Sequence, residues 1–279
     1  MSFGKGTEFE FRRRRWFMVG IFAVGFGCFE IDRMNAGQAL VILIKGGGLR
    51  THTPVSRAEI QAIFLVGAAL VAAGTALRTW GTSYLSAAVM QDSRIHSDRL
   101  VADGPYRYAR NPLYFGTLVM GVGLGLYASR LGWFVIVIGI LIFHSRLIRR
   151  EEAELEQAQG ESFRAYCRSV HRFWPSLWPR LPSSGRKPHL AQAFAGELFL
   201  WGVALASFIF AVSLKVVTWE IVLPIFFVIR VVQLRPKKPA PAQTATPHGV
   251  VFLLFALLGL AVSQARAASR DWLPSAAVA

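Results

Sequence analysis

The stretch LGWFVIVIGILIFHSRLI, residues 131–148, decides the fold class of this chain. It is apolar until His144, Ser145 and Arg146 near its end, and a helix that crosses a bilayer needs roughly 17 to 25 predominantly apolar residues. Because a backbone in lipid must satisfy its own hydrogen bonds, we expect this stretch to be helical. Another apolar stretch, PLYFGTLVMGVGLGLYA at residues 112–128, comes directly before it. The two stretches therefore predict a membrane hairpin.

Further apolar stretches lie outward from this hairpin. They are residues 16–31, 59–77, 193–214, 216–232 and 250–263. The apolar segment 38–44 is too short to cross a bilayer alone and is left uncounted. Because 53% of the residues are hydrophobic and only 17% are charged, an ordinary soluble domain is excluded. We therefore predict an all-α, polytopic membrane helical bundle with about seven transmembrane helices.

The basic residues indicate an orientation in the membrane. The formal net charge is +15, but the lysines and arginines lie between apolar stretches and form no stripe on a soluble module, which argues against a nucleic-acid partner. When the seven apolar stretches are counted in chain order, the basic residues collect before the first stretch and after the second, fourth and sixth. Spans that alternate in direction therefore place these basic residues on one side of the membrane. This side is expected to be cytoplasmic. We predict an integral protein of a bacterial inner membrane, with a cytoplasmic N-terminus and a retained first span.

Two features bear on organisation. Cys28 and Cys167 are the only cysteines, and they lie in unrelated surroundings, so neither a disulfide framework nor a metal site is indicated. A proline-bounded stretch at residues 182–188 divides the chain. We expect a membrane core at residues 1–182 and an appendage of three spans at residues 183–279, whose role the sequence does not indicate.

A polar segment, RLVADGPYRYARNPLYFG at residues 99–116, leads into the hairpin. Gly104 begins a turn, and Pro112 suits the first turn of a helix, for which Asn111 is a candidate cap. Arg107 and Arg110 precede that helix start, so together they predict an anion site. The alternative is that both arginines are topology signals that contact only lipid headgroups.

A second polar segment, RLIRREEAELEQAQGESFRAYCRSV at residues 146–170, leaves the hairpin on the same side. Its apolar residues predict an amphipathic helix on the cytoplasmic membrane surface, interrupted at Gly160. Glu151 and Glu152 are adjacent carboxylates that either serve a site or pair with neighbouring arginines in solvent. His144 shares a helix face with Glu151, so it is either a base or a packed side chain.

The combined pattern is more specific than its parts. The run GPYRYARNPLYFG, a helical hairpin and EEAELEQAQGESFRAYCRSVHRFWP together resemble the isoprenylcysteine carboxyl methyltransferase and phospholipid methyltransferase superfamily. The resemblance covers residues 65–175, and its signature covers residues 99–175. It implies a helical membrane fold whose cytoplasmic segments enclose S-adenosylmethionine, with a lipid or prenylated substrate that enters between spans. Asn111 stands where the family usually has histidine, and Ala102 and Asp98 are further departures.

The resemblance and the residue chemistry together assign roles. The expected catalytic residues are Arg110, Asn111 and His144. The expected cofactor-binding residues are Tyr106, Arg107, Arg110, Asn111, Pro112, Tyr114, Gly116, Glu151 and Glu152. Substrate contacts are expected from Tyr166 and Arg172, and no metal site is expected.

Several functions remain open at this stage. The leading hypothesis is an enzyme like isoprenylcysteine carboxyl O-methyltransferase, and the alternatives within the superfamily are phospholipid N-methylation and thiol S-methylation. The resemblance also leaves open an NADPH-dependent enzyme like the sterol reductases, and the apolar composition leaves open a membrane carrier. The sequence indicates no oligomeric state.

Overall fold

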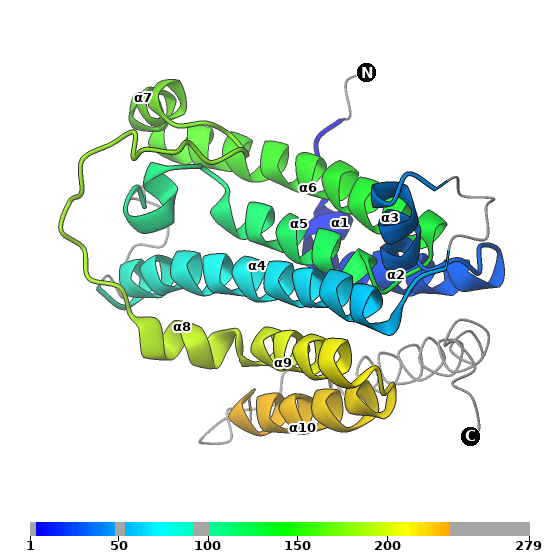
Figure 1. The fold of residues 1–279 in the computed structure, drawn as a ribbon. Coiled ribbons are helices and arrows are strands. Elements are labelled where there is room, and N and C mark those ends of the chain that lie inside the picture. Colours follow the sequence, from blue (N-terminus) through cyan, green and yellow to red (C-terminus); the bar gives the residue numbers. More distant parts are fainter. Residues whose placement is uncertain (1–3, 48–53, 92–100, 235–279) are drawn as a thin grey trace, which may run out of the picture. The chain divides into compact units, whose positions relative to one another are not determined.

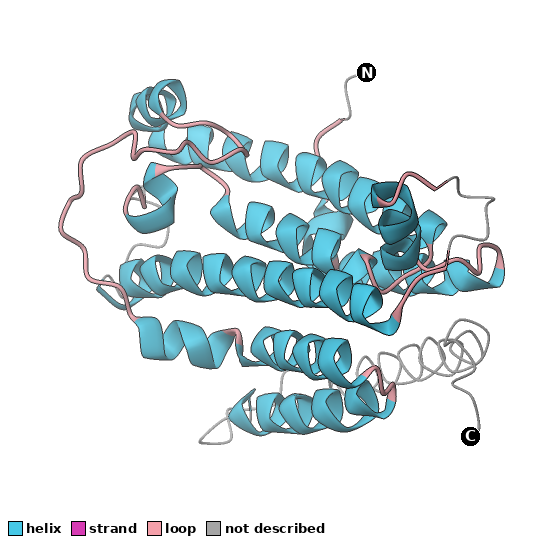
Figure 2. Ribbon diagram, in the orientation of Figure 1, coloured by secondary structure: helices cyan, strands magenta, loops and turns pink. Residues whose placement is uncertain are grey.

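The computed structural model describes residues 4–47, 54–91 and 101–234 (Figure 1). Every regular element within these ranges is helical, and no strand occurs in them (Figure 2). The elements in chain order are α1 (Glu8–Arg12), α2 (Arg14–Gly27), η1 (Cys28–Glu30), α3 (Ala36–Ile44), α4 (Arg57–Gln91), η2 (Gly104–Arg107), α5 (Pro112–Gly125), α6 (Arg130–Gln159), α7 (Glu161–Ser169), α8 (Leu190–Gly196), α9 (Leu198–Ser213) and α10 (Val217–Leu234). The predicted all-α class is confirmed.

Within the described ranges, two helices are long and apolar enough to cross a membrane, namely α4 over Arg57–Leu85 and α6 over Arg130–Gln159. Helices α8 and α9 pass the same test only as a pair, and a bend of 68° separates them. Helices α5 and α10 are apolar but shorter. The count of about seven spans therefore stays a prediction, and its last stretch, residues 250–263, lies outside the described residues.

Helix α4 extends well beyond the predicted stretch 59–77. At its start, Ser56 and Glu59 exchange hydrogen bonds as a capping pair, which satisfies backbone groups at the helix end. The helix continues past Arg78, whose guanidinium is paired with Glu197, as far as Gln91. The apolar segment 38–44 forms most of α3, whose N-terminus is capped by the side chain of Asn35.

The chain forms two compact units. The first consists of residues 1–17, 72–121 and 137–197, and the second of residues 18–71, 122–136 and 198–279. The core of the second unit is aromatic, with the rings of Phe64 and Tyr127 stacked at 4.8 Å and Phe210 beside both. The predicted division between residues 182 and 183 stays a prediction.

In the first unit, glycines let α4 and α5 approach closely. A Cβ at Gly116 would lie 2.8 Å from the carbonyl oxygen of Gly74, and a Cβ at Gly74 would collide with Gly116 in turn. Real side chains do not tolerate such contacts, so only glycine fits at this crossing. Gly116, predicted to bind the cofactor, is thus placed where it allows two helix backbones to touch.

Candidate active site

The first polar segment is held in place by backbone geometry and by a buried acid. Gly104 has a φ of +57° and faces the ring of Tyr84, so this position requires glycine. Asp103, which is 2% exposed, accepts hydrogen bonds from Ser183 and Ser184. Burial opposes ionisation of Asp103, yet these hydrogen bonds outweigh it and hold the pKa of its carboxyl below the ordinary value. The turn predicted at Gly104 is therefore confirmed as η2.

The two polar segments are bonded to each other. The hydroxyl of Tyr166 donates to the carbonyl of Tyr106 at 2.7 Å, and the backbone N–H of Arg110 donates to the carbonyl of His171 at 2.8 Å. The interruption of the helix at Gly160, whose φ is +56°, lets α7 change direction after α6, and Tyr166 is buried there. The expectation that these segments meet is confirmed.

Glu152 lies at the centre of this junction and is 8% exposed. The side-chain N–H of Asn111 donates to its Oε1 at 3.3 Å, and Nε of Arg172 donates to its Oε2 at 2.8 Å. Nε of Arg110 lies 3.1 Å from Oε1 as an ion pair, without the angles of a hydrogen bond. One carboxylate therefore faces two guanidinium groups, which leaves an excess of positive charge.

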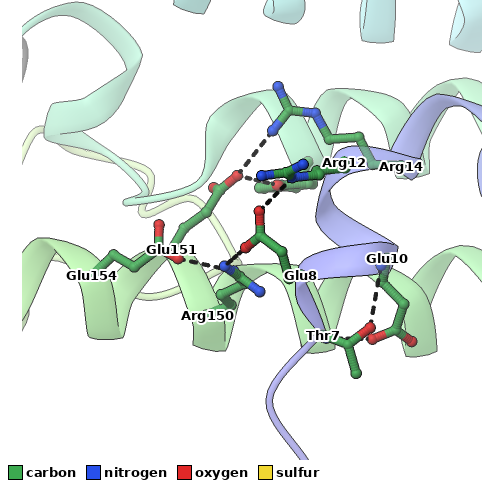
Figure 3. A network of polar contacts seen from close by, with 9 residues as sticks. Thr7, Glu8, Glu10, Arg12, Arg14, Arg150, Glu151 and Glu154 are labelled. Carbon is green, nitrogen blue, oxygen red and sulfur yellow. Dashed lines mark hydrogen bonds and ion pairs between the residues drawn. The ribbon is translucent and has the colours of Figure 1, made fainter.

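Glu151 has a different set of partners, because adjacent residues on a helix point about 100° apart. The hydroxyl of Tyr114 donates to Glu151 at 2.7 Å, and Arg14 lies 3.6 Å away (Figure 3). The ring of His144 packs edge-on against Tyr114 with centroids 4.7 Å apart. His144 is 3% exposed, and its Nδ1 has no hydrogen-bond partner among the described residues. Tyr114 thus links the histidine to the acid.

A cavity of about 550 Å³ opens beside Glu152. This volume lies in the range of small-molecule sites. Its cationic lining residues are Lys5, Arg110, Arg149, Arg164, Arg168 and Arg172. The acids Glu152 and Glu156 also line it. The cavity can accept an anionic group and a neighbouring cationic group together.

The remaining predicted site residues do not line this cavity. Arg107 donates from Nε to the carbonyl of Leu181 at 2.7 Å, apart from the ion pair of Arg110. Tyr106 is buried under Tyr166, and Pro112 begins α5 as expected. The structure therefore brings Arg110, Asn111, Glu152 and Arg172 into one cluster and Tyr114, His144 and Glu151 into another.

A comparison with protein families bears on what these clusters do. The family model described as phospholipid methyltransferase matches residues 62–162. The match contains most of α4, all of α5 and α6, and the paired Arg110 and Glu152. Residues 62–162 belong to the isoprenylcysteine carboxyl methyltransferase and phospholipid methyltransferase superfamily. The match supports a membrane methyltransferase at the superfamily level.

The other two comparisons gave no match. No curated protein and no solved structure matches the chain. The residues before 62 and after 162 lie outside the family match, and they include Lys5, Arg168 and Arg172 of the cavity wall. These parts of the site are described by the structure alone.

Two groups of residues that lie in or next to the first unit's polar contacts are not among those predicted from the sequence. The first group is the amino-terminal segment with Lys5, Glu8 and Glu10, which reaches α6 (Figure 3). Its only local signal is the pattern Thr7 to Glu10, a capping box that begins α1. Contact with α6, which follows more than a hundred residues later in the chain, leaves no such signal.

The second missed group is a polar cluster among apolar helices. Nη2 of Arg78 lies 3.1 Å from Oε1 of Glu197, and Nη1 donates to the hydroxyl of Thr117 at 2.8 Å. Thr82 donates to the same carboxylate at 3.0 Å. Arg78 directly follows the apolar stretch 59–77, and ionisable groups in membrane helices need partners. The sequence alone could therefore have indicated that Arg78 has an acidic partner.

Cys167 also lines the cavity. Burial raises the pKa of this thiol above its ordinary value. The thiol therefore stays protonated at neutral pH and is a poor nucleophile. The structure gives Cys167 a place in the wall and no chemical role.

Proposed function

We propose that the protein transfers a methyl group from S-adenosylmethionine to a lipophilic acceptor, in the manner of isoprenylcysteine carboxyl O-methyltransferase. The observation that carries this proposal is the contact between Arg110 and Glu152 at the wall of one cavity, within the family match. Arg110 precedes the hairpin in the chain and Glu152 follows its apolar part, and both belong to the motifs that resemble the superfamily.

The cavity lining fits the cofactor chemically. The carboxylate of S-adenosylmethionine calls for cations, which the lysine and arginine side chains of the cavity wall supply. The ammonium and ribose hydroxyls of the cofactor call for acceptors, which Glu152 and Glu156 supply. When bound, S-adenosylmethionine supplies an electrophilic methyl group on a sulfonium. The protein residues hold the reactants in line, and such positioning can contribute up to about 7–11 kcal/mol.

The absence of an imidazole at position 111 favours an acceptor that needs no base. Asn111 donates its amide N–H to Glu152 and to the carbonyl of Arg172, so it is a positioning residue for that carboxylate. His144 is buried against Tyr114 and does not line the cavity, so it is poorly placed to remove a proton from an acceptor there. A carboxylate is already ionised at neutral pH, which is why carboxyl O-methylation is our leading reaction.

Phospholipid N-methylation is the second candidate, since the matching family model carries that description. An ethanolamine acceptor would have to lose a proton before it reacts. Labelled-methyl transfer into separate vesicles with a prenylcysteine analogue and with phosphatidylethanolamine distinguishes the two. Product in the phosphatidylethanolamine vesicles alone would replace the leading reaction by the second one.

Cofactor binding is tested on the full chain in lipid nanodiscs by titration calorimetry. Arg110→Ala and Glu152→Gln are each expected to weaken S-adenosylmethionine binding by about tenfold, because each loses a charge-assisted contact. Glu30→Gln is the control, since this acid is exposed and does not line the cavity. Binding of NADPH in place of S-adenosylmethionine would contradict the proposal.

We also propose that the site faces the cytoplasm at the inner membrane of a bacterium. The support is the collection of basic residues in the segments around the cavity. Arg33→Cys and Lys187→Cys, each in a cysteine-free background, report the two predicted sides. An impermeant thiol reagent applied to intact cells should label Arg33→Cys alone, and the reverse pattern would overturn the orientation.

A further inference from the structure

The amino-terminal segment Gly4–Arg14 lies along α6, outside the family match. The backbone N–H of Gly6 donates to the carbonyl of Arg146 at 3.0 Å, and Gly6 is buried. A Cβ at Gly6 would lie 3.2 Å from that carbonyl oxygen, so the close approach favours glycine. The segment is thus fixed at a point directly after Lys5.

Two arginines of α6 hold the acids of this segment. The guanidinium of Arg146 forms a bidentate ion pair with Glu10, in which Nε donates to Oε1 at 3.0 Å and Nη2 donates to Oε2 at 2.9 Å. One turn further along α6, Arg150 pairs with Glu8 (Figure 3). Bidentate guanidinium–carboxylate contacts fix geometry as well as adding energy. These two ion pairs form what we call the α6 clamp.

A third contact joins the segment to the acid next to Glu152. Arg14 lies 3.6 Å from Oε1 of Glu151 (Figure 3). Its guanidinium also covers the ring of Phe11, 4.6 Å from the ring centroid. The segment is therefore attached to α6 on both sides of Glu8. The last of these contacts, between Arg14 and Glu151, lies next in sequence to Glu152 of the cavity wall.

The α6 clamp leaves Lys5 in the cavity wall, together with Arg149. The other lining arginines are already in ion pairs: Arg110 and Arg172 with Glu152, and Arg164 and Arg168 with Glu161. Among the described residues, neither Lys5 nor Arg149 forms an ion pair. Lys5 and Arg149 are therefore the lining cations that have no acid partner of their own among the described residues.

We propose that the amino-terminal segment builds an anion-binding wall of the methyl-transfer cavity, in which Lys5 and Arg149 bind an anionic group of the ligand. This inference rests on the proposed function. The anion is a carboxylate or a phosphate, and it comes either from the methionine part of S-adenosylmethionine or from the headgroup of a phospholipid acceptor. The α6 clamp positions Lys5, so Glu8 and Glu10 act through it and do not touch the ligand.

A ligand pair that differs only in its carboxylate tests the first source. Wild-type protein and Lys5→Ala are titrated in nanodiscs with S-adenosylmethionine and with its decarboxylated analogue. An exposed cation contributes little, so we expect a loss of about fivefold for S-adenosylmethionine and no loss for the analogue. Lys5→Arg should restore binding, and Arg15→Ala, which removes an exposed charge from the same region, should have no effect.

The second source is tested with fluorescent phosphatidylglycerol in neutral detergent micelles. If the anion is a headgroup phosphate, Lys5→Ala weakens this lipid by about fivefold and leaves S-adenosylmethionine binding unchanged. Unchanged affinity for both probes in Lys5→Ala and in Lys5→Glu would overturn the inference. Failure of wild-type protein to bind S-adenosylmethionine would instead refute the proposed function, so the two failures are distinct.

The role of the α6 clamp is tested by non-additivity. The variant Glu8→Gln with Glu10→Gln should lose as much affinity as Lys5→Ala, because the segment no longer holds Lys5 at the cavity. Adding Lys5→Ala to that variant should then cause no further loss. Independent, additive losses would show that the clamp does not position Lys5 and would overturn this step.

Discussion

Two charge clusters of the first unit differ in their balance. Around Glu152, one carboxylate meets the guanidinium groups of Arg110 and Arg172, with further cations in the cavity wall. Between α4 and the end of α8, Arg78 meets Glu197 one to one, and threonine hydroxyls satisfy the remaining hydrogen bonds. A balanced pair has no charge left for a ligand, whereas the unbalanced cluster does. The difference distinguishes a structural ion pair from a binding site.

The largest expected effect tests the balanced pair. Glu197→Ala leaves Arg78 without its acid, and loss of one partner of a buried pair costs roughly 3–5 kcal/mol. The side chains of Arg78 and Glu197 are 25% and 11% exposed, so we expect the lower end of that range. The apparent Tm in detergent measures it.

A double variant sharpens this test. Arg78→Met with Glu197→Leu removes both charges and should recover most of the lost stability, since apolar replacements of a buried pair are often neutral. The same variant should bind S-adenosylmethionine like the wild type. A stable double variant with abolished binding would make this pair part of the site and end the distinction.

An intermediate effect tests the unbalanced cluster. Arg172 and Arg168 both line the cavity, but Arg172 donates to Glu152 whereas Arg168 donates to the exposed Glu161. Arg172→Ala should weaken ligand binding by about tenfold, because a charge-assisted contact to a buried carboxylate is lost. Arg168→Ala should change it less than about twofold. Equal effects in binding titrations would show that only total charge matters.

The smallest effect concerns the α6 clamp. The Arg146 guanidinium, with the backbone of Thr7, lowers the pKa of Glu10 from 4.5 to about 2. A carboxyl whose pKa is lower in the folded state stabilises the fold above its unfolded pKa, and this stabilisation is lost as the pH falls towards the folded pKa. For this partly exposed pair it should be below about 1 kcal/mol.

The pH dependence of the apparent Tm checks this contribution. The difference between wild-type protein and Glu10→Gln should be constant from about pH 7 to 5 and should shrink from about pH 4.5 towards 2. A difference that persists at the lowest pH would mean that the glutamine distorts α1, and the clamp would then not depend on charge.

The hairpin and its junction were predictable because their signals are local. The length of the apolar stretch predicts α6, Pro112 begins α5, and Gly160 separates α6 from α7. The alternation of spans then puts both polar segments at one end, which is enough to expect that the two segments lie close together. Each of these steps uses only neighbours in sequence or the topology of a hairpin.

The partners within the junction were not predictable. Sequence assigns Arg107 and Arg110 to one anion and both adjacent glutamates to one cofactor, whereas the fold sends Arg107 to Leu181 and gives Glu151 to Tyr114. Side-chain partners depend on helix rotation and on the return path of the chain, which no local pattern encodes. For the same reason the amino-terminal segment was interpreted only as a topology signal.

The glycine contact between α4 and α5 limits where a hydrocarbon chain could pass between the helices. Where Gly74 and Gly116 bring the two backbones together, no side chain separates them and no gap remains for a hydrocarbon tail. An acyl or prenyl chain cannot enter the first unit through that crossing. A lipid substrate of the proposed reaction would therefore have to enter along another flank, and a bulky residue at either glycine would push the two helices apart.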